Sequence, residues 1–279
     1  MTVAPSPIDA TASVPLKLRI KHRLAVSALA APIETLRRHL SSLRGINHPE
    51  LGLLRQEDRY IDLLLTRLIQ PDWTCLDVGG HLGSVSYKLR QLTPNGRLII
   101  VEASPGKAAL LRASFPDCDV HPVAVSDVDG QVSFFENLSQ PGFSSLADRS
   151  GRGDTHEITV PARRLDDLIA DDITPDFIKI DVEGFEYPAL RGGDALLRRC
   201  RPIVLFEAGA AQDETLDTSL TDNLFQMFTD DLNYDVFAAF DLYFDRPALT
   251  AAQFRSYRQY PFAAFNYFAV PRDAKGTRS

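Results

Sequence analysis

Short apolar runs rich in β-branched residues alternate with helical patterns along most of this 279-residue chain. The runs expected to form strands are residues 74–78, 97–101, 119–125, 177–182 and 203–206. Helical patterns at residues 85–92, 107–114 and 187–200 separate most of them. Strands that are apolar on both faces require helices on both sides of their sheet. The alternation therefore predicts an α/β protein built on a doubly wound, mostly parallel sheet.

The C-terminal part of the chain breaks this alternation. Residues 235–240 and 265–270 have the composition of strands, and no convincing helical pattern of useful length lies between them. Strands joined without a crossover helix pair antiparallel. We expect these two to close one edge of a seven-stranded sheet.

The first 54 residues differ from the rest in composition. Residues 1–14 are small and polar and include prolines, which predicts a disordered tail. Residues 15–54 are expected to form a helical extension, since leucines and isoleucines recur there at helical spacings. Residues 15–44 carry a net charge of +6, whereas residues 45–279 carry −12. We expect the extension to pack on a main domain spanning residues 55–279; docking to a partner or a membrane surface is the alternative.

The overall composition excludes several classes of protein. Hydrophobic residues make up 44% of the chain and charged residues 24%, which is typical of a globular domain. A net charge of −7 disfavours a nucleic-acid partner, because such binding depends on neutralising phosphates. The three cysteines are scattered, which favours reduced thiols. With no apolar run near the roughly 18 residues of a spanning helix, we expect a cytoplasmic protein.

A glycine turn follows the first expected strand. The segment 76–83 reads Leu-Asp-Val-Gly-Gly-His-Leu-Gly, and Ser84 is expected to cap the next helix. Glycines let a backbone approach a ligand closely. Glu102 ends the second strand 19 residues after Gly83, the spacing of a carboxylate that binds a ribose diol. The turn and the acid together predict a nucleoside-containing cofactor.

Asp77 discriminates between cofactors. It stands where a dinucleotide-binding motif has its first glycine, and its charge would repel a pyrophosphate. An acidic side chain there suits a cationic sulfonium ligand, which favours S-adenosylmethionine. A nicotinamide-dependent oxidoreductase remains the alternative enzyme, and a catalytically silent protein-binding module that uses the basic N-terminal helices is the alternative outside enzymes.

Several further motifs, in order, resemble the FkbM family of S-adenosylmethionine-dependent methyltransferases. Besides the glycine turn, the matching segments are residues 123–127 (VAVSD), 178–186 (IKIDVEGFE), 204–207 (VLFE) and 266–271 (NYFAVP). The resemblance covers about residues 55–271 and implies a class I methyltransferase fold. One departure is the pair Gly80-His81, which replaces the family's Ala-Asn, so an asparagine contact to the cofactor does not carry over.

The turn and this resemblance assign nine residues to the cofactor. They are Asp77, Gly79, Gly80, His81, Gly83, Glu102, Ala103, Ser126 and Asp127. Within this set, the last two follow the third strand and are expected to flank the adenine.

Three carboxylates in six residues mark the expected catalytic end of the site. Asp181 ends the fourth strand, and Glu183 and Glu186 follow it. Neighbouring carboxylates raise one another's pKa, which suits a general base. We expect Asp181 and Glu183 to orient or deprotonate the acceptor, with capping as an equal alternative for Glu183 and the favoured one for Glu186.

A metal site is conceivable but not favoured. Glu207 ends the fifth strand and could join Asp181 in holding Mg²⁺, but no third ligand is visible. We therefore assign no metal ligands. The hypothesis is methyl transfer from S-adenosylmethionine to a hydroxyl of a sugar or polyketide-type natural product, a small-molecule acceptor, by a protein that could form homo-oligomers.

Overall fold

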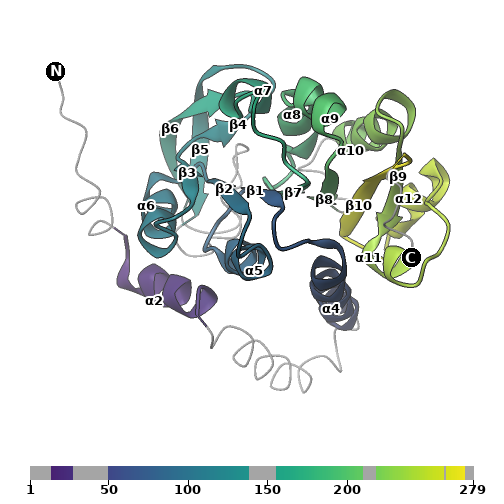
Figure 1. The fold of residues 1–279 in the computed structure, drawn as a ribbon, viewed down its shortest axis with the longest axis horizontal. Helices are drawn as coiled ribbons and strands as arrows, with labels where there is room; N and C mark the ends of the chain where they lie inside the picture. Colours follow the sequence, from purple (N-terminus) through teal and green to yellow (C-terminus); the bar gives the residue numbers. More distant parts are fainter. Residues whose placement is uncertain (1–13, 28–49, 138–154, 210–217, 261, 274–279) are drawn as a thin grey trace.

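The computed structural model describes residues 14–27, 50–137, 155–209, 218–260 and 262–273. Its main feature is a seven-stranded sheet with the order β3-β2-β1-β7-β8-β10-β9, which the labels of Figure 1 follow from left to right. The strands are β1 (Thr74–Val78), β2 (Arg97–Val101), β3 (Asp119–His121), β7 (Phe177–Ile180), β8 (Ile203–Glu207), β9 (Tyr234–Ala238) and β10 (Asn266–Pro271). All neighbours pair parallel except β8–β10 and β10–β9, which are antiparallel. The expected doubly wound fold with an antiparallel edge is confirmed.

Helices cover both faces of this sheet. One face packs against α7 (Leu165–Leu168), α8 (Glu186–Arg191), α9 (Asp194–Cys200), α10 (Thr218–Gln226), the π-helix η4 (Met227–Asp231) and α12 (Ala251–Tyr257). The other face packs against α4 (Glu50–Leu68), α5 (Ser84–Leu92), α6 (Pro105–Ser114) and α11 (Ala239–Tyr243). Alternate residues of each strand enter the two cores: Leu76 lies in the first and Cys75 in the second, both fully buried. This double burial explains why the strands are apolar throughout.

A second sheet corrects the expected third strand. Residues 119–125 do not form one strand, because β3 ends at His121 and β4 (Ala124–Val125) joins another sheet. Pro122 lies between them and lacks the N–H that a continuous ladder would use. The second sheet, of order β4-β6-β5, adds β5 (Gly130–Asn137) and β6 (Thr155–Arg163), which the sequence analysis did not anticipate.

Two smaller expectations were also wrong. The helix expected at residues 187–200 is two helices, broken at Gly192 and Gly193, since glycine is a poor helix former. The expected N-cap Ser84 is the first residue of α5, and Gly83 occupies the cap position in a left-handed conformation. Between β9 and β10, where no helix of convincing length was expected, the structure has only the short helices α11 and α12 among its described residues.

The N-terminal extension is described only in part. α2 (Leu16–Ala25) packs beside α6 in Figure 1, with Val14 and Leu18 contacting Leu110 in a small apolar cluster. Residues 1–13 of the expected tail and residues 28–49 of the expected helical segment lie outside the described residues. No helix in the described part of the chain is long and apolar enough to cross a membrane.

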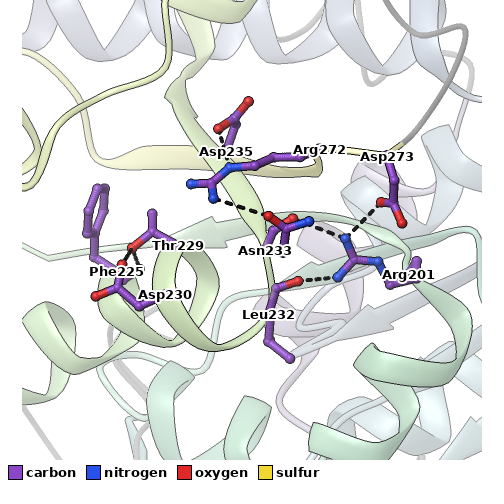
Figure 2. Close-up of polar contacts among 9 residues, drawn as sticks. All are labelled: Arg201, Phe225, Thr229, Asp230, Leu232, Asn233, Asp235, Arg272 and Asp273. Carbon is purple, nitrogen blue, oxygen red and sulfur yellow. Dashed lines mark hydrogen bonds and ion pairs between the residues drawn. The ribbon is translucent and has the colours of Figure 1, made fainter.

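Arg201, which follows α9, joins the end of that helix to β9 and β10. Figure 2 shows its guanidinium between the carbonyls of Leu232 and Asn233 and the carboxylate of Asp273. It also lies 4.5 Å from the centre of the Tyr234 ring. Arg201 thus satisfies backbone carbonyls at the antiparallel edge, close to Arg272, which binds Asp235 and Asn233 in the same view.

Replacing Arg201 by Met keeps the side-chain stem and removes these bonds. We expect the free energy of unfolding to fall by about 2 kcal/mol, measured by urea denaturation. The matched control is Arg97→Met, which breaks an ion pair with Asp119 whose side chains are 50% and 48% exposed. That control should lower the free energy of unfolding by less than about 1 kcal/mol. Equal losses in the two variants would contradict the role given to Arg201.

Candidate active site

The glycine turn after β1 contacts the ends of both neighbouring strands, β2 and β7. The N–H groups of Gly79 and Gly80 donate to the carbonyl of Val101 at 2.8 and 3.0 Å. Gly79 has φ +80°, and a Cβ there would lie 1.9 Å from the carbonyl oxygen of Asp181. Only glycine permits this approach, so the turn lies directly against the end of β7.

Glu102 is held in place by the turn and by the loop that follows β2. It is buried, and its two carboxylate oxygens accept N–H groups from His81 and Ser104, each at 2.8 Å. Each carboxylate oxygen has a second lone pair. Because Glu102 lines the pocket described next, these lone pairs are available to hydroxyl donors of a ligand.

A pocket of about 180 Å³ lies over the carboxyl ends of β1, β2 and β7. This is where doubly wound sheets bind ligands. Of the residues expected at the site, seven line it: Gly79, Gly80, His81, Glu102, Ala103, Asp181 and Glu183. An apolar wall made by Val123, Ala124, Val125 and Phe134 faces this polar set. Phe134 comes from β5, so the unanticipated second sheet supplies part of the site.

Four expected site residues lie outside the lining. Asp77 is fully buried beneath the turn, where its Oδ2 accepts the hydroxyl of Ser86 at 2.5 Å. Gly83, which lies at the start of α5, packs against Leu111 of α6. Ser126 hydrogen-bonds Asp127, whose carboxylate pairs with an arginine of α8. Ser126 and Asp127 directly follow Val125, which lines the pocket, but are not themselves part of the lining.

Lys179 is a site residue that the sequence analysis missed. Its ammonium lies 3.7 Å from Asp77 and 3.4 Å from Asp181, and it donates to the carbonyl of Gly79 at 3.2 Å. Burial alone would lower the pKa of Lys179, but the negative charges of Asp181 and Asp77 outweigh burial and raise it. The available signal was a lysine in an otherwise apolar buried strand, since a buried charge requires a partner.

Lys179 also changes the electrostatics of the carboxylates. Burial would raise the pKa of Asp181, but the adjacent ammonium lowers it. Glu207, hydrogen-bonded to Asp181, has its pKa raised by burial and by the charge of Asp181. The expectation that Asp181, Glu183 and Glu186 raise one another's pKa is thus wrong for Asp181 and right for Glu186, whose pKa burial and the charge of Asp181 raise. Of the pair Asp181 and Glu207, Asp181 therefore loses its proton at the lower pH.

The loop after β7 has an unusual backbone. Glu183 and Gly184 have φ values of +55° and +98°. Oε1 of Glu186, at the start of α8, accepts the N–H groups of Val182 and Gly184 at 2.9 and 3.2 Å. Glu186 therefore holds this loop, and Glu183 is carried into the pocket lining.

No cluster of three or more His, Cys, Asp or Glu side chains with metal-ligand geometry occurs among the described residues. Asp181 and Glu207 do adjoin, as expected, but they share a hydrogen bond with each other.

Comparison with known proteins identifies the family. A family model described as "Methyltransferase FkbM domain" matches residues 77–236, more than half of the chain. The chain therefore belongs to the FkbM methyltransferase family. Membership confirms the methyltransferase class and the S-adenosylmethionine cofactor expected from the sequence, and decides against the nicotinamide alternative. The family match ends well inside the chain at both ends, and α2 and α4 lie outside it.

Similar solved structures include the methyltransferase FkbM from Methylobacillus flagellatus KT, with 17% identity and a TM-score of 0.46. That alignment covers 72% of this chain and 44% of the other, so this chain spans less than half of its length. The plantazolicin methyltransferase BpumL, in complex with a pentazolic desmethylPZN analog and SAH, has 12% identity and a TM-score of 0.44, covering 92% and 98% of the two chains. No curated protein matches the chain.

The pKa of Glu186 generates a prediction about stability. Burial, followed by the charge of Asp181, raises this pKa from 4.5 to about 7. Because the folded-state pKa lies above the unfolded one, the charge on Glu186 destabilises the fold. That cost is absent below pH 4.5 and grows as the pH rises to about 7.

Glu186→Gln keeps an Oε1 acceptor for both N–H groups and removes the charge. We expect the variant to be more stable than wild type at pH 8 by on the order of 3 kcal/mol, at about 1.4 kcal/mol per pKa unit. At pH 4.5 the two should be equally stable in urea denaturation. A stability difference that does not change with pH would contradict the assignment.

Proposed function

We propose that this protein transfers the methyl group of S-adenosylmethionine to a hydroxyl of a small molecule of the sugar or polyketide type. The observation that carries the proposal is Asp181: an ionised carboxylate at the end of β7, held by Lys179, in the pocket that Glu102 borders. A hydroxyl nucleophile needs such a group to orient it and accept its proton.

The described residues fit the cofactor. Glu102 would hold the ribose hydroxyls, since backbone N–H groups position both of its oxygens and the residue lines the pocket. The flat adenine would lie against the apolar wall that includes Val125 and Phe134. A sulfonium is favoured near the negative charges of Asp181 and Glu183. When bound, this cofactor supplies an electrophilic methyl group.

The low pKa of Asp181 is compatible with its role as the base. A hydroxyl proton becomes strongly acidic only as the oxygen forms its new bond to carbon, so a weak base that is always ionised is sufficient. Before that, the carboxylate orients the oxygen by accepting its hydrogen bond. Glu183, in the same lining, would bind a further hydroxyl of the acceptor. Acceptors rich in hydroxyls, such as sugars and polyketides, suit this pair of carboxylates.

Glu102→Gln tests the cofactor assignment. The amide can accept only one of the two N–H bonds, and it removes the charge that faces the ribose, so we expect S-adenosylmethionine to bind about 10- to 100-fold more weakly. Isothermal titration calorimetry measures this directly. Wild-type protein that gives no binding heat, or a variant that binds as tightly as wild type, would contradict the assignment.

Asp181→Asn tests the base. We expect kcat to fall about 10²- to 10³-fold, measured with a hydroxylated acceptor found by screening for methyl incorporation. The affinity for S-adenosylmethionine should change less than about threefold. The matched control is Glu207→Gln, which imitates the protonated state of the partner carboxyl. This control should lower kcat less than about tenfold. An Asp181→Asn enzyme with wild-type kcat, or methylation of amine acceptors alone, would refute the mechanism.

A further inference from the structure

A buried histidine of α2 connects this helix to the cofactor turn. His22 is 3% exposed. Its Nδ1 lies 3.0 Å from the carbonyl of Leu82, and its Nε2 lies 2.7 Å from the hydroxyl of Ser114 at the end of α6. A carbonyl can only accept, so Nδ1 carries the hydrogen, and the neutral ring accepts the Ser114 hydroxyl at Nε2. Burial lowers the pKa of His22, which favours this neutral form.

Apolar contacts strengthen the same connection. Leu82 packs on the cluster formed by Val14, Leu18 and Leu110. A Cβ added to Gly106, near the start of α6, would lie 3.1 Å from Val14, so the residue two positions before α2 lies close to the start of α6. Two loops flank Glu102: Leu82 of the first packs on the cluster that includes Leu18 of α2, and the second leads into the start of α6, which Val14 contacts.

Those two loops supply both hydrogen bonds to Glu102. His81, which precedes Leu82, donates one N–H, and Ser104, two residues before Gly106, donates the other. His81 has φ +48°, a left-handed conformation that costs a non-glycine residue about 1–3 kcal/mol. The backbone keeps this conformation only where its surroundings hold it.

We propose that His22 is a positioning residue for cofactor binding. By holding the carbonyl of Leu82, it keeps the preceding His81 N–H directed at Glu102, and so fixes the carboxylate that binds the ribose. This inference rests on the proposed function, and it gives the N-terminal helix, which lies outside the family match, a part in the cofactor site.

Two conservative variants separate the bonds that His22 makes. Asn places an N–H donor near the position of Nδ1, within reach of Leu82, whereas Gln places one near Nε2, within reach of Ser114. We expect His22→Gln and His22→Leu to weaken S-adenosylmethionine binding about 5- to 10-fold, the value of one hydrogen bond, and His22→Asn to stay within about twofold of wild type. Ser114→Ala should also stay within about twofold.

Calorimetry gives the affinities, and kcat at saturating S-adenosylmethionine should be unchanged in every variant. The Arg201→Met variant distinguishes a positioning role of His22 from a merely structural one. It destabilises the fold far from the pocket and should leave the affinity for S-adenosylmethionine unchanged. If His22→Leu does not fold, the affinities of the His22→Gln and His22→Asn variants still test the proposal.

Four results would overturn the inference. Equal affinities for the Asn and Gln variants would show that the bond to Leu82 does not matter, and an Arg201→Met variant with equally weakened binding would show that lost stability alone is responsible. Wild-type protein that does not bind S-adenosylmethionine would overturn the proposed function as well; normal wild-type binding with tight-binding His22 variants would overturn this inference alone.

Discussion

The ammonium of Lys179 is the interaction on which the site depends. β1 and β7 pair in a register that sets Asp77 beside Lys179, and the fully buried Asp77 forms an ion pair with it. A buried carboxylate without a cation would destabilise the fold strongly. The same ammonium binds the carbonyl of Gly79 and the carboxylate of Asp181. One buried charge thus connects the two central strands, the glycine turn and the proposed base.

This arrangement divides the acidic groups of the site into two kinds. Asp181 adjoins the cation, which lowers its pKa, whereas burial and the charge of Asp181 raise the pKa values of Glu186 and Glu207. The carboxylate of Glu102 instead accepts hydrogen bonds from backbone N–H groups. A pocket lined by carboxylates is therefore compatible with a stable fold, and its negative charge is concentrated where a cationic sulfonium would bind.

The sequence predicts the parts of the site that are local. The turn at residues 79–83 and the position of Glu102 follow from spacing along two adjacent strands, and the structure places Glu102 beside the turn. The role of Lys179 depends on the register between β1 and β7, which are about 100 residues apart and which no local pattern specifies. Ser126 and Asp127 were expected to flank the adenine because they follow the third expected strand, and they lie outside the pocket lining, next to Val125, which is part of it. Pro122 ends that strand, and the segment joins another sheet whose Phe134 lines the pocket instead.

The central claim is that this pocket binds S-adenosylmethionine through Glu102 with the sulfur directed toward Asp181. A crystal structure of the full chain with S-adenosylhomocysteine tests it most directly. We predict both ribose hydroxyls within hydrogen-bond distance of the Glu102 carboxylate, the adenine against Val125 and Phe134, and the sulfur on the side of the pocket that holds Asp181. A nucleoside bound elsewhere, or a ribose held without Glu102, would contradict the account.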